Sequence, residues 1–166
     1  MNDIWDGYRP GVLGELVALQ TRYYAASHGF GQPFECKVAR EMAAFLERLD
    51  PARDLFRTVW RGERLLGSLT LDASEAADGE LAHLRWLFVV PEARDRGLAR
   101  ALLDEALAQA RRVGKSGAYL TTIDNLEAAA RLYRGAGFVV TETHSGESWG
   151  RMVTEVRMEY RFGVVG

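Results

Sequence analysis

The chain has 166 residues, 48% of them hydrophobic, which is typical of one globular domain with a sizeable buried core. Its 21 lysines and arginines against 23 aspartates and glutamates give a formal net charge of −2, so it lacks the basic excess of proteins that bind nucleic acids or anionic membranes. No segment approaches about 18 uninterrupted apolar residues, and the N-terminus has no signal-peptide pattern. With Cys36 as the single cysteine, we expect one soluble, cytoplasmic domain, residues 1–166, without a nucleic-acid or membrane partner.

Two helices are predicted in the first third of the chain. Apolar residues recur at helical spacing after Pro10, which suits a first helical turn, and this helix should end near Ser27. Residues 28–33 contain glycines and a proline and should separate it from the next helix. Apolar positions within residues 38–49 predict a second helix that ends before Pro51.

Three strands are predicted next. Residues 55–60 and 65–71 flank a short polar link, residues 61–64, whose glycine favours a β-hairpin. Residues 74–80 should form an exposed loop, and residues 81–90 a longer strand. The chain therefore changes from helix to sheet.

The second half of the chain alternates helices and strands. We predict a helix over residues 98–113, a strand over 118–123, a helix over 126–136 and a strand over 138–143. Apolar and charged residues then alternate over residues 152–162, which predicts a strand with one buried and one charged face. This order of elements predicts an α/β domain with a mixed sheet, and the final strand offers an edge for pairing in a homodimer.

The segment VVPEARDRGLARALL, residues 89–103, places two arginines and a glycine at the start of a helix. It has two interpretations. Asp95 could cap the helix while Arg94 and Arg96 are solvated and Gly97 makes the bend. Alternatively, the backbone N–H groups of the turn bind a phosphate, because the helix dipole favours an anion there and glycine permits a close approach.

Two motifs resemble those of the GNAT superfamily of N-acetyltransferases. Arg94, Gly97 and Ala99 match its (Q/R)xxGx(G/A) pyrophosphate loop, and NLEAAARLYRGAGF, residues 125–138, resembles its second signature. The segments DGYRPG, HGFGQPFECKVAREM and ESWGRMVTEVRME are most similar to the acetyltransferase domain that is often fused to a MarR-type winged-helix domain. The winged-helix part has no counterpart in this sequence, so we carry over no DNA-binding role.

The resemblance implies a GNAT fold, with a mostly antiparallel, twisted, mixed sheet and helices on both faces. It also implies acetyl-CoA as the donor, with the pantetheine chain along the backbone of Phe88 and Val89. Arg94 belongs to the same loop. The pyrophosphate is expected on the backbone N–H groups of Arg96, Gly97, Leu98, Ala99 and Arg100.

Tyr133 matches the family's general acid, which protonates the leaving thiolate, and a phenol with a pKa near ~10 can donate at neutral pH. Asn125 is expected either to contact coenzyme A or to cap the following helix. Tyr133 also has a purely structural alternative, since a tyrosine at helical spacing often belongs to the core.

An amine nucleophile must lose a proton before it attacks, so a base is needed. His83, six residues before Val89, lies where several GNAT members place a base, and an ordinary histidine pKa of ~6.5 suits the task. His83 could equally face solvent near the start of its strand. Glu35, Glu41 and His28 are weaker candidates.

We therefore expect an acetyl-CoA-dependent N-acetyltransferase that acts on a primary amine of a small molecule or peptide by direct transfer in a ternary complex. The alternative is a non-catalytic acyl-CoA-binding module, which would have no need of the acid Tyr133. No metal is expected, because His28, His83 and His144 lack ligand spacing.

Overall fold

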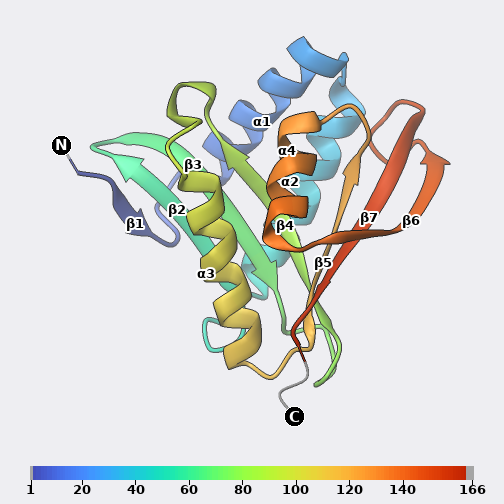
Figure 1. The fold of residues 1–166 in the computed structure, drawn as a ribbon. Helices are drawn as coiled ribbons and strands as arrows, with labels where there is room; N and C mark the ends of the chain where they lie inside the picture. Colours follow the sequence, from blue (N-terminus) through green and yellow to red (C-terminus); the bar gives the residue numbers. More distant parts are fainter. Residues whose placement is uncertain (1, 164–166) are drawn as a thin grey trace.

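The computed structural model describes residues 2–163, which form a seven-stranded sheet and four α-helices (Figure 1). The sheet order is β1-β2-β3-β4-β5-β7-β6, and in these residues the β4–β5 pair is parallel while the other neighbouring pairs are antiparallel. The predicted mixed, mostly antiparallel sheet is confirmed. The elements are β1 Ile4–Asp6, α1 Val12–His28, α2 Gln32–Glu47, β2 Leu55–Arg61, β3 Arg64–Asp72, β4 Leu81–Val89, the 3-10 turn η1 Pro91–Ala93, α3 Leu98–Arg112, β5 Gly117–Ile123, α4 Glu127–Ala136, β6 Val139–Gly146 and β7 Val153–Arg161.

Helices cover both faces of the sheet, because both faces carry apolar side chains. In Figure 1, α3 and α4 lie in front of the sheet and α1 and α2 behind it. The front core packs Leu102 and Leu103 of α3 against strand residues such as Leu69. The rear core packs the buried residues Leu16 of α1 and Phe45 of α2 against the other face. In residues 2–163, no helix is long and apolar enough to cross a lipid bilayer.

Three sequence predictions differ from the structure. The short edge strand β1, whose Ile4 pairs with Trp60, was missed because three residues show no alternation. Helix α2 starts at Gln32, so Pro33 lies in its first turn, where a missing N–H is tolerated. The final strand β7 lies between β5 and β6, so it has no free edge for a partner chain.

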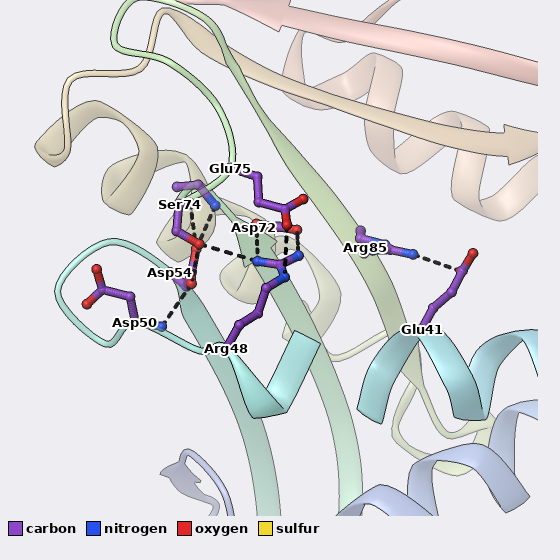
Figure 2. A network of polar contacts seen from close by, with 9 residues as sticks. Glu41, Arg48, Asp50, Asp54, Asp72, Ser74, Glu75 and Arg85 are labelled. Atoms are coloured by element: carbon purple, nitrogen blue, oxygen red, sulfur yellow. Dashed lines mark hydrogen bonds and ion pairs between the residues drawn. The ribbon is translucent and has the colours of Figure 1, made fainter. Parts of the chain in front are cut away.

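A buried polar network joins the end of α2 to the end of β3 (Figure 2). Arg48, which follows α2, donates to both carboxylate oxygens of Asp72 and pairs with Glu75 at 3.2 Å. Asp54, only 3% exposed, accepts from the backbone N–H groups of Ala73 at 2.8 Å and Ser74 at 2.9 Å, and from the Ser74 hydroxyl at 2.9 Å. An acceptor is required here, because the buried N–H group of Ala73 has lost its hydration.

Replacing Asp54 with alanine should lower the free energy of unfolding by about 3 kcal/mol, because several charge-assisted hydrogen bonds are lost and buried N–H groups stay unpaired. Urea denaturation measures the change. Glu63→Gln, at an exposed carboxylate of the β2–β3 turn, is the control and should leave the unfolding midpoint in place. A loss for Asp54→Ala no larger than that of the control would contradict this account of the network.

Candidate active site

The sheet opens between β4 and β5. The two parallel strands pair at Leu81, Ala82 and His83, and the last pair joins His83 to Tyr119. Beyond this pair the strands diverge, as Figure 1 shows, and β4 keeps a partner on the β3 side only. Backbone groups of β4 on the other side therefore face the opening, which we call the β4–β5 gap, rather than a neighbouring strand.

A β-bulge in β4 accompanies the divergence. Between two pairings with β3, Ser68 with Phe88 and Thr70 with Arg85, β4 advances by three residues and β3 by two. Trp86 inside the bulge has a φ of 52°, an uncommon value for a bulky residue. No local sequence pattern marked this position, because an aromatic residue is no signal for a left-handed backbone.

A cavity of about 540 Å³ extends through the β4–β5 gap. Arg85 and Thr121 line it from the face covered by α1 and α2, while Leu84 and Leu120 line it from the face of the front core. Successive side chains of a strand point to opposite faces, so a cavity lined by neighbours such as Leu84 and Arg85 connects both sides of the sheet.

The β6–β7 loop forms part of the rear wall of the cavity. Trp149 of this loop stacks on Phe34 of α2, with ring centroids 5.6 Å apart and an interplanar angle of 11°. Arg151 donates to the carbonyl oxygen of His28 at 2.9 Å, which fastens the loop to the α1–α2 turn. Segments more than a hundred residues apart thus form one wall.

Tyr133 of α4 lies in the cavity wall and is 8% exposed. Burial raises the pKa of its phenol well above the ordinary value, and the nearby Tyr24 adds to the shift. The phenol is therefore protonated at neutral pH and available as a proton donor. The sequence prediction that Tyr133 is the acid remains a prediction, and its placement in the cavity supports it.

His83 also lines the cavity, stacked on Tyr119 with ring centroids 4.4 Å apart. Burial lowers the pKa of its imidazole to about 3, and the positive charges of Arg85, Arg157 and Lys37 contribute. The expectation of an ordinary histidine pKa is wrong, because desolvation and three cations both oppose protonation. The alternative of a solvent-facing side chain is wrong as well.

The other predicted base candidates are placed differently. Glu41 lines the cavity but lies 2.9 Å from the Lys37 ammonium. It also lies 2.8 Å from the Arg85 guanidinium, as Figure 2 shows. Glu35 and His28 do not line the cavity. Glu41 is thus held in an ion-pair cluster that ties α2 to β4.

Sequence reasoning missed two buried polar groups in the cavity wall. Glu155 of β7 was assigned to the charged, exposed face, yet it is 4% exposed and lies beside His144 of β6. Gln20 of α1 is 4% exposed, and its Nε2 has no hydrogen-bond partner within residues 2–163. A donor in this state is a contact point for a ligand oxygen. Alternation in sequence could not reveal the burial of Glu155, because the loop and helices around it decide the exposure.

The turn before α3 presents free backbone N–H groups. The N-cap residue is Gly97, with a φ of 74°, and no side chain caps the helix. Asp95 adopts a φ of 63° and does not cap, so the predicted Asp95 cap is wrong, while Gly97 does make the bend. The N–H groups of the first turn, those of Leu98, Ala99 and Arg100, are therefore open to an external acceptor.

The three arginines of this segment have different surroundings. Arg94 folds back, donating to the carbonyl oxygen of Val89 at 3.1 Å and to the Tyr23 hydroxyl at 3.0 Å, so it braces the turn. Arg100 pairs with Asp104 at 2.9 Å. Arg96 is exposed and forms no ion pair within residues 2–163.

The remaining predicted contacts lie at the end of β4 and before α4. Phe88 and Val89 are buried residues, at 5% and 6% exposure, on the last part of β4. Asn125 is exposed, has a φ of 68° and precedes the N-cap Leu126, where no side chain caps α4. The capping interpretation of Asn125 is therefore wrong.

Solved structures with the same fold include acetyltransferases. A protein from Salmonella typhimurium, described as an acetyltransferase and solved with its cofactor acetyl-CoA, is 18% identical with a TM-score of 0.71, covering 100% of this chain and 97% of its own. A ribosomal-protein-alanine N-acetyltransferase from Brucella melitensis is 17% identical with a TM-score of 0.72, covering 96% of this chain and 99% of its own. At these identities the likeness concerns the fold.

Sequence comparison identifies the family. A mycothiol acetyltransferase from Geodermatophilus obscurus is 35% identical over 105 residues, which are 61% of this chain and 33% of the relative. The chain thus matches about a third of the length of that relative. The model of the acetyltransferase (GNAT) family matches residues 15–138, most of the described sheet and its helices. The chain belongs to the acetyltransferase (GNAT) family.

Proposed function

We propose that the protein transfers an acetyl group from acetyl-CoA to a primary amine of a small molecule or peptide, by direct attack in a ternary complex. The observation that carries this proposal is the cavity through the β4–β5 gap, which is lined from both faces of the sheet. A thioester entering along β4 and an amine entering from the α1–α2 side meet in one enclosed space. Holding both reactants in this way removes much of the entropic barrier of a bimolecular reaction.

The donor site follows from the open backbone groups. The pantetheine chain, which contains amides, would lie along β4 near Phe88 and Val89, where the strand has no second neighbour. The diphosphate would bind the uncapped N–H groups at the start of α3, close in sequence to Arg96, which forms no ion pair within residues 2–163. The relative from Salmonella typhimurium, which was solved with acetyl-CoA, supports this donor.

The chemistry assigns a role to each group in the cavity. The amine nitrogen attacks the thioester carbonyl carbon, and N–H groups of β4 in the gap stabilise the oxygen that becomes negative. As the carbon–sulfur bond breaks, the thiolate takes the phenolic proton of Tyr133. His83 stays neutral at physiological pH and offers a hydrogen bond rather than a charge.

The proposal extends to the branch of the family, the dimer contact and the compartment. The segments quoted above favour the branch of the family that occurs fused to MarR-type domains. A homodimer, if formed, would not pair through β7, which already has two neighbouring strands. The exposed Cys36, which forms no disulfide, fits a reducing compartment such as the cytoplasm.

Replacing Tyr133 with phenylalanine should lower kcat by about 100-fold, the contribution typical of a general acid, and leave the Kd of acetyl-CoA within about twofold. Thiol release with a panel of amines, amino acids and peptides measures turnover, and calorimetry measures binding. Tyr8→Phe, at a tyrosine 58% exposed, is the matched control. Unchanged turnover in Tyr133→Phe would remove the acid role and favour a binding module.

Acetyl-CoA should bind about tenfold or more tightly than acetyl-pantetheine, which has the same thioester but no diphosphate. Arg96→Ala should reduce this ratio several-fold, because a cation beside the diphosphate is lost. Arg40→Ala, on the exposed surface of α2, should leave the ratio as it is. Equal affinities of the two ligands for the unaltered protein would mean that the diphosphate adds nothing to binding, which would contradict a diphosphate site at the start of α3.

The lowered pKa of His83 makes stability depend on pH. The unfolded chain binds this proton with a pKa near 6.5 and the folded chain with a pKa of about 3, so the contribution is complete above pH 6.5 and is lost as the pH falls towards 3. Between pH 7 and pH 5 the loss should be about 2 kcal/mol. Urea denaturation of the unaltered protein and of His83→Gln should show this difference in slope, and parallel pH dependences would refute the burial argument.

A further inference from the structure

Two carboxylates, those of Glu41 and Glu155, line the cavity, and they differ in their partners. The Glu41 carboxylate is bridged by the cations of Lys37 and Arg85. Within residues 2–163, the one basic group paired with Glu155 is His144, whose Nε2 lies 2.6 Å from its Oε2. A buried carboxylate that lacks a permanently charged partner offers its oxygens to an ammonium group that enters beside it.

The sheet holds this pair in place. Glu155 of β7 lies opposite His144 of β6 and opposite Ile123 of β5, so the three side chains share the face covered by α1 and α2. Gly146 fits closely over the carboxylate, since a Cβ at this position would lie 2.5 Å from Glu155 Oε2. The strand register, rather than a flexible loop, therefore sets the position of both side chains.

The two side chains also differ in access to solvent. The side chain of Glu155 is 5% exposed, whereas that of His144 is 61% exposed and still contributes to the cavity wall. The imidazole thus stands at the mouth of the cavity, in contact with both its interior and the solvent. A carboxylate beside Nε2 favours the tautomer with its proton on that nitrogen, which leaves the lone pair on Nδ1 as a proton acceptor.

We propose that His144 is the base that deprotonates the acceptor amine and that Glu155 positions it and stabilises the imidazolium that forms. This inference rests on the proposed acetyl transfer. It makes His144 a catalytic residue and Glu155 a positioning residue, the arrangement in which a carboxylate orients a histidine base. It also defines the acceptor as an amine that arrives as its ammonium form, drawn to the negative charge of Glu155.

The proton balance is complete with these groups. The ammonium gives one proton to Nδ1 of His144 and becomes the free amine, whose nitrogen forms a bond to the thioester carbon. When the carbon–sulfur bond breaks, the sulfur receives the Tyr133 proton, and the second proton leaving the nitrogen restores the phenol. The imidazolium then loses its proton to solvent at the cavity mouth, so the products are amide, thiol and one released proton.

The competing base candidate faces an unfavourable field. The positive charges of Arg85, Lys37 and Arg157 all act on His83, so an ammonium group beside it would be repelled. At the other end of the lining, the Glu155 carboxylate attracts the same group. The charge distribution of the cavity therefore separates a site for the amine near His144 from the cationic end near His83.

The test compares kcat, acceptor KM and the acetyl-CoA Kd in variants of the complete chain. His144→Asn should lower kcat by about 100-fold with the acetyl-CoA Kd unchanged, and added imidazole should restore part of the rate. Glu155→Gln should lower kcat by about tenfold alone and have almost no effect in the His144→Asn background, because it acts through the imidazole. Glu142→Gln, at an exposed position, and His28→Asn, at a half-buried position, both outside the cavity, are the matched controls, and circular dichroism verifies folding.

The possible results either support or overturn the role of His144 as the base. Loss of kcat with imidazole rescue in His144→Asn, together with a non-additive Glu155→Gln effect, supports the proposal. Retained kcat in His144→Asn, additive effects of the two changes, or rescue by imidazole in His83→Asn instead, overturns it while acetyl transfer by the unaltered protein stands. If the unaltered protein acetylates no amine of the panel, the proposed function fails and this inference fails with it.

Discussion

The parting of β4 and β5 beyond the His83–Tyr119 pair is the constraint on which the rest of the site depends. A continuous ladder would fill the centre of the sheet with backbone hydrogen bonds and leave no space for reactants. Because the strands diverge, one edge of β4 keeps unpaired backbone groups and a cavity connects both faces. The bulge at Trp86 lies on the strand at this opening, where a left-handed residue redirects the chain.

Contacts from distant segments hold the opened sheet. The Glu41–Arg85 ion pair joins α2 to β4 beside the gap, and the network of Arg48 and Asp54 fixes the end of α2 to the end of β3 (Figure 2). Arg151 fastens the β6–β7 loop to the α1–α2 turn. A sheet in which two strands lack part of their hydrogen-bond ladder is less cooperative at that place. The charge-assisted bonds from these distant segments restrict the motion of the elements around the opening.

The cavity separates groups by charge state. Burial raises the pKa of Tyr133 and lowers that of His83, so both side chains are neutral at physiological pH. Cations gather near His83 and are partly balanced at Glu41, whereas within residues 2–163 the one basic group paired with Glu155 is His144. An enclosed site with neutral groups inside and an exposed histidine, paired with a buried carboxylate, at its mouth is suited to taking a proton from an entering ammonium and passing it to solvent.

The sequence by itself determined the order of helices and strands, the hairpin of β2 and β3, and the two motifs that place Gly97 and Tyr133, because periodicity and turn chemistry are local properties. Only the tertiary structure decided that β4 and β5 part, that Asp95 leaves α3 uncapped, that Arg94 braces its own turn and that Glu155 is buried beside His144. Strand β1 was not predicted, because three residues are too few to show an alternating pattern. Register, burial and the field of neighbouring charges arise from residues far apart in the chain, so no local pattern encodes the protonation states or partners on which the proposed chemistry depends.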